Sequence, residues 1–320
     1  MPPRILIIGA NGQLGSELAI ALVEKYGAAQ VVTSDIAPAK SGTLKHEILD
    51  ATDAEALRRV VVENGVTQIY HLAAALSATG EKKPLWAWNL NMSSLLNVLE
   101  LAAELNLRIF WPSSIAVFGA TTPADHTPQK TIIEPETVYG VSKQAGEGWC
   151  RWYHKTHGVD VRSLRYPGLI SWKTPPGGGT TDYAIDIFRA AASGETYTCF
   201  LDANETLPMM YMADALRATI ELMEAPAEAI TEHGSYNVAG VSFSPAEIAA
   251  EITRQSPGFR IEYAPDYRQA IAAAWPDSLD DSQAARDWGW RAEYGLARLT
   301  REMLAGMKRQ TPATPCQMAK

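Results

Sequence analysis

The sequence contains little cysteine and little histidine, which limits the disulfide and metal chemistry open to it. Its three cysteines, Cys150, Cys199 and Cys316, are odd in number and far apart, so a disulfide framework is not expected. No Cys-x-x-Cys pair indicates a zinc site. Among the six histidines, His154 and His157 share one face of a predicted helix, but histidines on a polar helix surface are more often solvated than metal ligands. We therefore predict no metal site.

Long apolar runs and a surplus of basic residues are also missing. No stretch of 18 or more apolar residues predicts a membrane span, and the strand-like run Arg4–Ile8 follows no signal-peptide pattern. The net charge of -8 argues against a nucleic-acid partner, because such partners are bound by clustered lysine and arginine. With 320 residues, 47% of them hydrophobic, the chain can bury a sizeable core. These features favour a cytoplasmic enzyme without a membrane or nucleic-acid partner.

The first half of the chain alternates short apolar runs with amphipathic stretches, a pattern typical of βαβ units in a parallel sheet. The runs predict strands at Arg4–Ile8, Gln30–Thr33, Thr67–His71, Arg108–Pro112 and Val159–Arg165. The stretches predict helices near Gln13–Tyr26, Ala54–Asn64, Trp88–Leu105 and Val138–His157. Right-handed crossovers place the carboxyl ends of these strands along one edge of the sheet, and ligands are expected at that edge.

A glycine-rich turn follows the first predicted strand. Gly9 permits the tight turn, Gly12 lets the backbone approach a pyrophosphate, and Gly15 lets the next helix pack closely on the strand. Phosphates are expected at the N-terminus of that helix, where free N–H groups and the helix dipole favour negative charge. Asp35 ends the second strand, where an acid binds the adenosine ribose hydroxyls and repels a 2′-phosphate. This context predicts a Rossmann site that prefers NAD to NADP.

Two further segments are candidates for the dinucleotide site. Asp50 is placed to contact the adenine amine, with helix capping as the alternative for it or for Asp53. The small residues of His71–Ala74 end another strand and are suited to lie against a bound dinucleotide. The alternative for that stretch is an ordinary buried strand end.

Three side chains form a candidate catalytic group. Tyr139 and Lys143 are four residues apart in a predicted helix and share a face, and Ser114 lies at a strand end that reaches the same place. Oxidation of an alcohol needs a base, and free tyrosine, with a pKa of about 10, is too weak at neutral pH. An ammonium about 4 Å away favours the phenolate by ~4 kcal/mol at an effective dielectric constant of 20. That is about three pKa units, so we predict a pKa of Tyr139 close to neutrality.

After Arg165 the alternation stops. The segment Thr174–Thr181 is rich in proline and glycine and predicts a loop. Helices are expected near Ala184–Ala192 and Ala213–Met223, and another after Ser244, which starts a capping box with proline at its first helical position.

The predicted fold class is α/β, a Rossmann doubly wound parallel sheet with a smaller C-terminal substrate domain. We expect residues 1–171 to form the NAD-binding domain, to which roughly residues 208–240 partly return. Residues 172–207 and 241–310 are expected to form the substrate domain, and residues 311–320 a frayed tail.

Gly-x-x-Gly-x-x-Gly, the serine and Tyr-x-x-x-Lys together resemble the extended short-chain dehydrogenase/reductase family, relatives of UDP-galactose 4-epimerase. The likeness covers nearly the whole chain. The segments most similar to the epimerase-like L-threonine 3-dehydrogenases of that family are Pro112–Gly119, Leu164–Ile170, Pro175–Tyr183 and Leu207–Met212. The resemblance implies oxidation of the β-hydroxyl of L-threonine by NAD to 2-amino-3-oxobutyrate.

The resemblance also implies roles for individual residues. Tyr139 would be the base, Lys143 its electrostatic partner and a ribose ligand, and Ser114 the hydroxyl donor to the substrate oxygen. The predicted cofactor contacts are Gly9, Asn11, Gly12, Gln13, Leu14, Gly15, Asp35, Asp50, Leu72, Ala73, Ala74, Asn91, Tyr139, Lys143, Tyr166, Pro167 and Leu169, the last three beside the nicotinamide.

Substrate recognition rests on a few polar groups, because threonine is a small zwitterion. Ser77, Thr180 and Thr181 are candidates for its carboxylate, Asp182 for its ammonium, and Trp275 for its methyl group. Ser114 and Tyr139 complete the predicted substrate contacts. The alternative for each of the loop residues is ordinary packing.

Two other functions are alternatives to the implied activity, and one oligomeric state is expected. A sugar-nucleotide epimerase or dehydratase would need cations for a second diphosphate, and Lys173 alone lies near the start of the Thr174–Tyr183 segment. A non-catalytic NAD-binding sensor would not need Ser114, Tyr139 and Lys143 together. The aromatic face of helix Val138–His157, with the family's habit of pairing such helices across a two-fold axis, favours a homodimer.

Overall fold

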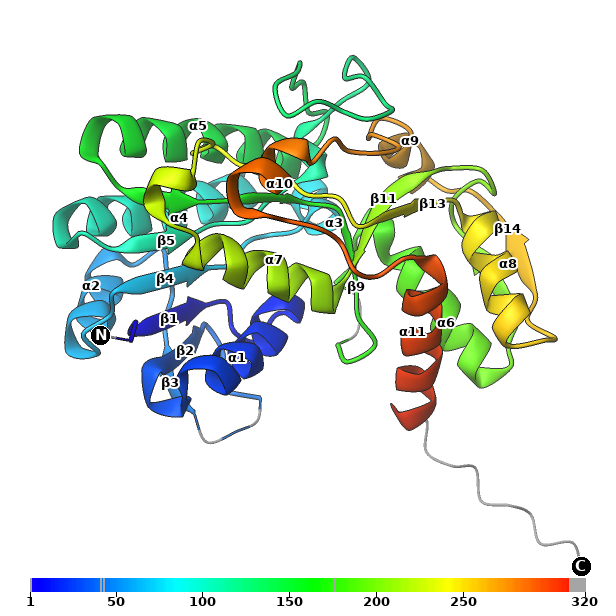
Figure 1. Ribbon diagram of the computed structural model, residues 1–320, viewed down its shortest axis with the longest axis horizontal. Helices are drawn as coiled ribbons and strands as arrows, with labels where there is room; N and C mark the ends of the chain where they lie inside the picture. Colours follow the sequence, from blue (N-terminus) through cyan, green and yellow to red (C-terminus); the bar gives the residue numbers. More distant parts are fainter. Residues whose placement is uncertain (1, 41, 43, 175–176, 311–320) are drawn as a thin grey trace, which may run out of the picture.

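A parallel sheet with helices on both faces forms the larger part of the protein (Figure 1). The computed structural model describes residues 2–40, 42, 44–174 and 177–310. Within these residues the largest sheet has six strands, in the spatial order β3 (Lys45–Ile48), β2 (Val31–Asp35), β1 (Ile5–Ile8), β4 (Gln68–His71), β5 (Arg108–Phe110) and β7 (Asp160–Arg162). The order reverses between β1 and β4, which confirms the predicted doubly wound sheet and places a ligand crevice at that point.

Strand β1 shows why the sheet needs two covering layers. Ile5 and Ile7 pack on one side with α1 (Gln13–Tyr26), α7 (Met212–Glu224) and α10 (Ser282–Trp288). Leu6 and Ile8 pack on the other side with α2 (Ala54–Glu63), α4 (Pro84–Leu105) and α5 (Val138–His157). Since successive side chains of a strand point to opposite faces, an all-apolar strand is stable only when both faces are covered.

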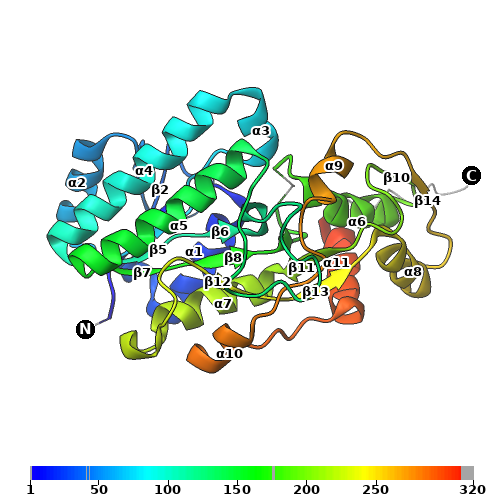
Figure 2. The same cartoon turned by 90° about the horizontal axis from the view of Figure 1, so that it is seen from above.

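A second group of elements has a core of its own. Helices α6 (Tyr183–Ser193), α8 (Pro245–Gln255) and α11 (Leu296–Gln310) pack together, at the end of the molecule far from α2 (Figure 2). Smaller sheets complete the described strands: β9 (Gly168–Ile170) with β11 (Leu207–Tyr211) and β13 (Val241–Phe243), β10 (Tyr197–Cys199) with β14 (Ile261–Tyr263), and β6 (Ser113–Ser114) with β8 (Leu164–Tyr166) and β12 (Tyr236–Asn237).

Short helices connect these parts. They are α3 (Ser77–Lys82), α9 (Arg268–Ala272), η1 (Ala28–Gln30), η2 (Ile115–Val117), η3 (Thr180–Asp182) and η4 (Ala227–Ala229). From the C-terminal half, α7 shares a core with β1, and β12 pairs with β8. The expected domain bounds stay a prediction.

Most predicted elements are present, with instructive exceptions. Helices Gln13–Tyr26 and Val138–His157 have the predicted bounds, and Ser244 forms the predicted capping box with Glu247. The single strand predicted at Val159–Arg165 is wrong. It divides at Ser163 into β7, which pairs with β5 in the large sheet, and β8, which pairs with β6 and β12 in a different sheet.

Two other elements differ from the prediction. The helix predicted from Trp88 begins at Pro84, since proline is well tolerated in the first turn. Strand β3 was not predicted, because Lys45–Ile48 is a half-exposed edge strand without an apolar run. The predicted tail, residues 311–320, and Cys316 lie outside the described residues. In the described part of the chain, no helix is both long enough and apolar enough to cross a membrane.

Candidate active site

A cavity opens where the strand order reverses, between the large sheet and the second group of elements. The residues of its wall that had been predicted as cofactor contacts are Gly9, Gly12, Gln13, Leu14, Gly15, Leu72, Ala74, Tyr139, Lys143, Tyr166, Pro167 and Leu169. The predicted substrate contacts on its wall are Ser77, Ser114, Tyr139, Thr180, Thr181, Asp182 and Trp275. One cavity therefore brings the predicted cofactor and substrate residues together.

Close backbone packing explains the glycines at the base of this cavity. Gly9 has a φ of 85°, and a Cβ there would lie 2.7 Å from the backbone nitrogen of Ala73. A Cβ on Gly15 would lie 2.3 Å from the Gly9 carbonyl oxygen. Any side chain at either position would push α1 away from β1 and β4. The turn therefore keeps the N-terminus of α1 at the crevice.

The start of α1 has the donors that a pyrophosphate requires. Gly12 is the N-cap and offers no side-chain acceptor, and no acidic residue lies in the first turn. The Gln13 Nε2 is buried and has no hydrogen-bond partner in the protein. Gly12, Gln13 and Leu14 all line the cavity. An unpaired buried donor beside uncapped helix N–H groups fits the anionic phosphates of a dinucleotide.

Asp35 lies at the carboxyl end of β2, beside the glycine turn. Its carboxylate accepts hydrogen bonds from the Asn11 N–H (3.0 Å) and the Ala37 N–H (3.3 Å). The Asn11 side-chain amide donates to the carbonyls of Ala37 and Pro38. Both residues thus shape the turn at the end of β2, and neither lines the cavity itself, so their contact with the cofactor stays a prediction.

Three other predicted cofactor contacts also lie off the cavity wall. Asp50 accepts hydrogen bonds from the N–H and hydroxyl of Thr52, and Asp53 is the residue that caps α2. Ala73 packs its backbone on Gly9. The buried amide of Asn91 bonds the backbone of Ala75 and the Ser142 hydroxyl, so it ties the segment after β4 to α5. Direct contact of Asp50, Ala73 and Asn91 with the cofactor stays a prediction.

The N-terminus of α5 is held tightly against the strand that carries Ser114. The Thr137 hydroxyl caps α5 by accepting the Gly140 N–H, and the Glu81 carboxylate of α3 accepts the Val138 N–H at 2.7 Å. A Cβ on Gly140 would lie 2.1 Å from the Ala116 carbonyl oxygen. These contacts fix the position of Tyr139, the second residue of the helix.

Lys143 lies one turn further along α5 and is almost completely buried. Its Nζ donates to the Pro112 carbonyl at 2.6 Å, lies 4.5 Å from the centroid of a Trp111 ring and 5.5 Å from that of the Tyr139 ring. The hydrogen bond to the Pro112 carbonyl holds the ammonium at the strand end next to Ser114. The predicted grouping of a phenol, an ammonium and a serine hydroxyl is therefore present in the fold.

The predicted pKa of Tyr139, however, is wrong for the protein alone. Burial raises the pKa of Tyr139 to about 12, and a hydrogen bond with Ser114 only partly opposes that increase. Burial also lowers the pKa of Lys143 to about 7, and electrostatic interactions with Cys150 and Glu147 oppose that decrease. Loss of water destabilises both the phenolate and the ammonium, and it is the largest cause of both shifts.

The opposite wall of the cavity follows β8 and β9. Tyr166, Pro167 and Leu169 line it as predicted for a nicotinamide wall. The Tyr166 hydroxyl points away and bonds Thr219 of α7, so the tyrosine presents its ring rather than its hydroxyl. Gly168 has no room for a side chain, since a Cβ would lie 2.7 Å from Thr181. This glycine lets the η3 segment approach the wall.

The predicted substrate residues come from both parts of the protein. Ser77 begins α3 on the sheet side, whereas Thr180, Thr181 and Asp182 form η3. Trp275 is 9% exposed and packs in the core of the second group of elements. One Asp182 oxygen accepts the N–H groups of Gly178 (2.7 Å) and Gly179 (2.6 Å), so this carboxylate closes the glycine loop and has one oxygen left for a ligand.

Several wall residues were not predicted from the sequence: Leu76, Pro112, Ser113, Ile115, Gly168, Gly177 and Gly179. Five of them are chain neighbours of a predicted residue, whereas Pro112 is two positions from Ser114 and Gly177 three positions from Thr180. Glu81 gave no signal of this kind, because its role depends on α3 folding against α5. Among the described residues, no cluster of three histidine, cysteine or acidic side chains is arranged to hold a metal ion.

A family model described as "NAD dependent epimerase/dehydratase family" matches residues 5–239. An uncharacterized epimerase/dehydratase of Staphylococcus haemolyticus is 45% identical, covering 95% of this chain and 98% of its own.

Solved structures give a more specific likeness. The holo form of the GalE-like L-threonine dehydrogenase from Cupriavidus necator is 69% identical over 96% of this chain and 100% of its own, with a TM-score of 0.95. The apo form of that enzyme is 63% identical over 95% and 99% of the two chains, with a TM-score of 0.84. A monomeric L-threonine 3-dehydrogenase from a metagenome is 46% identical over 96% and 99%, with a TM-score of 0.92. Since the family model spans more than half of the sequence, this chain belongs to the NAD-dependent epimerase/dehydratase family.

Proposed function

We propose that this protein is an NAD-dependent L-threonine 3-dehydrogenase that converts L-threonine to 2-amino-3-oxobutyrate. The observation that carries the proposal is a single cavity in which Tyr139, Lys143 and Ser114 lie beside an uncapped helix N-terminus. The Cupriavidus necator protein, 69% identical over nearly all of both chains, is an L-threonine dehydrogenase. That likeness supports the choice of substrate.

In the proposed reaction Tyr139 is the base and Ser114 holds the substrate hydroxyl. The C3–H bond breaks with its electron pair leaving as hydride, the hydroxyl proton moves to the Tyr139 oxygen, and a ketone forms at C3. When bound, NAD⁺ accepts the hydride on its nicotinamide ring. Because burial disfavours the Tyr139 phenolate, the role of Lys143 is to supply a positive charge to it from within the same pocket.

The proposed substrate contacts use the two sides of the cavity. Thr180 and Thr181 offer hydroxyls to the carboxylate, with Ser77 opposite them. The oxygen of Asp182 that does not bind the glycine loop is assigned to the ammonium. Trp275 provides the apolar surface for the methyl group. A substrate held from both sides excludes water from the hydride path.

Sugar-nucleotide chemistry on the same fold is the second candidate, and the cavity wall argues against it. Lys143 is the only cationic side chain among the described residues that line the cavity. A nucleotide diphosphate bound in addition to NAD would bring two further negative charges with no arginine to pair them. A non-catalytic NAD sensor is disfavoured because Ser114, Tyr139 and Lys143 are all held in place by specific contacts.

We also propose a homodimer formed by α4 and α5. These helices pack side by side and expose tryptophans, with Trp152 46% and Trp86 51% accessible. Large exposed aromatic side chains on adjoining helices are typical of a subunit interface. Sedimentation of the wild type and of Trp152→Glu tests this, and a wild type of monomer mass, as in the metagenomic relative, would contradict it. The cytoplasmic location and the division into two domains stay predictions.

A substrate panel tests the proposed activity. NADH formation is followed at 340 nm with L-threonine, its stereoisomers and L-serine, and UDP-sugars are tested for epimerisation. We expect L-threonine to give the highest kcat/KM and UDP-sugars to remain unchanged. Turnover of a UDP-sugar without net NADH formation would favour the second candidate.

A further inference from the structure

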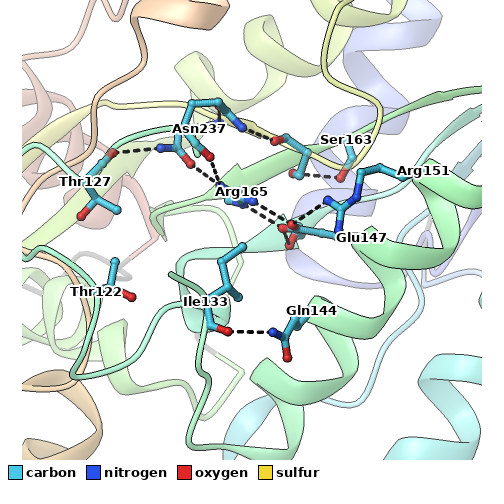
Figure 3. A network of polar contacts seen from close by, with 12 residues as sticks. Thr122, Thr127, Ile133, Gln144, Glu147, Arg151, Ser163, Arg165 and Asn237 are labelled. Carbon is cyan, nitrogen blue, oxygen red and sulfur yellow. Dashed lines mark hydrogen bonds and ion pairs between the residues drawn. The ribbon is translucent and has the colours of Figure 1, made fainter. Parts of the chain in front are cut away.

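A buried ion pair joins Glu147 of α5 to Arg165 of β8 (Figure 3). The side chains of Glu147 and Arg165 are 1% and 3% exposed. Arg165 donates from Nε to Glu147 Oε1 and from Nη2 to Oε2, both at 2.8 Å. This two-point contact is the strongest geometry for such a pair, and it is needed because both charges have been removed from water.

The same carboxylate contacts the strand that carries Ser114. Ser113 donates its hydroxyl to Glu147 Oε1 at 2.7 Å. In the parallel register of β6 and β8, Ser113 pairs with Arg165 and Ser114 pairs with Tyr166. Glu147 is therefore bound to the chain neighbour of Ser114 and to the chain neighbour of Tyr166.

Glu147 also lies one helical turn after Lys143 on α5. Its negative charge raises the pKa of Lys143 and so opposes the effect of burial. Arg151, one turn further on, has its Nη1 3.8 Å from the other Glu147 oxygen, at the outer end of the pair. The ion pair thus contributes to the electrostatics of the pocket as well as to its geometry.

The contacts continue from Arg165 to Asn237 of β12 and from there to two backbone carbonyls. Arg165 Nη1 donates to the Asn237 side-chain oxygen at 3.0 Å, as Figure 3 shows. The Asn237 amide donates to the carbonyls of Thr127 (3.0 Å) and Asp280 (3.3 Å). Asp280 belongs to the segment that carries Trp275. One continuous set of hydrogen bonds therefore joins α5, β6, β8, β12 and the Trp275 segment.

We propose that Glu147 is a positioning residue for the reaction: held by Arg165, it fixes Ser114 relative to Tyr139 and Lys143 and supports the charge of the Lys143 ammonium. This inference rests on the proposed alcohol oxidation. It assigns a role in that reaction to a side chain that does not line the cavity. A purely structural ion pair would affect folding alone.

Glu147→Gln tests the proposal, because it keeps the shape of the side chain and removes its charge. We expect kcat to fall roughly 10- to 100-fold, as small displacements of reacting groups do, with an NAD Kd changed less than about threefold. The alkaline limb of the kcat/KM profile should move to lower pH, since Lys143 loses its proton more readily without Glu147. Loss of stability with an unchanged kcat and pH profile would overturn the proposal.

Two further variants separate positioning from folding. Glu147→Leu with Arg165→Met replaces the pair by apolar groups of similar size, which commonly preserves stability. We expect the unfolding temperature of this double variant to return toward the wild-type value while its kcat stays low. A return of both quantities to wild-type values would overturn the proposal. Asp214→Asn is the matched control, since Asp214 is a buried carboxylate paired with Arg217 on α7. It should lower stability without moving the pH profile.

A readout independent of turnover keeps the two proposals distinguishable. Lys143→Met and Glu147→Gln are combined in a double-mutant cycle of unfolding free energies at pH 6 and pH 10. We expect a coupling at pH 6, where Lys143 is charged, that disappears at pH 10. If the cycle shows coupling between Lys143 and Glu147 but the protein does not oxidise L-threonine, only the proposed function is contradicted. Absence of coupling at both pH values would overturn the role of Glu147.

Discussion

The Lys143 ammonium nitrogen lies 5.5 Å from the centroid of the Tyr139 ring, in a pocket where Lys143 is buried and Tyr139 is partly buried. Burial raises the pKa of Tyr139 to about 12 and lowers that of Lys143 to about 7. Burial is the largest cause of both shifts, so the pocket disfavours the phenolate and the ammonium alike.

Replacing Tyr139 by phenylalanine removes the proposed base and little else. We expect kcat to fall roughly 10²- to 10⁴-fold, the usual contribution of general-base catalysis, with NAD affinity little changed. Tyr153→Phe is the matched control, because it removes a phenol from the same helix but from a position bonded to Glu100. Near-normal kcat in Tyr139→Phe would exclude this residue as the base.

Lys143 should lower stability in a pH-dependent way. Its folded-state pKa of about 7 lies below the ordinary value of 10.5, so between these values the unfolded chain binds a proton that the folded protein does not. The destabilisation is complete below about pH 7 and diminishes as the pH rises toward 10.5. Lys143→Met should therefore raise the unfolding temperature more at pH 6.5 than at pH 10.

The control for that measurement is Lys155→Met, since Lys155 is an exposed lysine on the same helix. Its effect on the unfolding temperature should be small and the same at both pH values. If Lys143→Met raised the unfolding temperature equally at pH 6.5 and pH 10, Lys143 would have to be charged in the folded protein at both pH values.

Asp35 should determine the choice between NAD and NADP. Its carboxylate lies at the end of β2, where it would repel a 2′-phosphate. Asp35→Asn keeps an oxygen for the Asn11 N–H and removes the charge. We expect the ratio of kcat/KM with NAD to kcat/KM with NADP to fall roughly 10- to 100-fold. This fall corresponds to about 1.4–2.7 kcal/mol of discrimination between the two cofactors. Equal use of both cofactors by the wild type would contradict this role.

The glycine loop before η3 should control closure over the substrate. Gly178 has a φ of 92°, and its N–H is bonded to Asp182. An alanine there is strained by about 1–3 kcal/mol in this conformation. Gly178→Ala should lower kcat/KM for L-threonine more than it lowers NAD affinity. Gly148→Ala is the control, because Gly148 is helical with free space around it.

A pair of structures, with NAD alone and with NAD plus L-threonine, would show the closure directly. This chain superimposes on the holo form of the Cupriavidus necator enzyme with a TM-score of 0.95 and on its apo form with 0.84. The two forms of that enzyme therefore differ in shape. Superimposable positions of η3 and Trp275 in both structures would contradict closure.

The parts of the site that the sequence predicted are those coded by local spacing. The glycine turn, the pair Tyr139 and Lys143, and Ser114 each follow from a short motif at the end of a strand or the start of a helix. Such motifs have fixed geometry once the strand and helix form. Strand β3 was missed because an exposed edge strand carries no apolar pattern.

Contacts between distant segments were not predictable in this way. The bond from Glu81 to the Val138 N–H joins residues 57 apart, and the bond from Arg165 to Asn237 joins residues 72 apart. The pKa of Tyr139 was predicted in the wrong direction for a related reason. Spacing shows that two side chains share a face, but the cost of removing them from water depends on everything packed around them.

The most direct test of the proposed function follows the hydrogen at C3 of the substrate. L-Threonine carrying deuterium at C3 is incubated with NAD and the protein, and the reduced cofactor is analysed by mass spectrometry. Hydride transfer from C3 predicts NADH one mass unit heavier, formed by the wild type and lost with Tyr139→Phe. Reduced cofactor without deuterium, or no reduction of NAD by L-threonine at all, would contradict it.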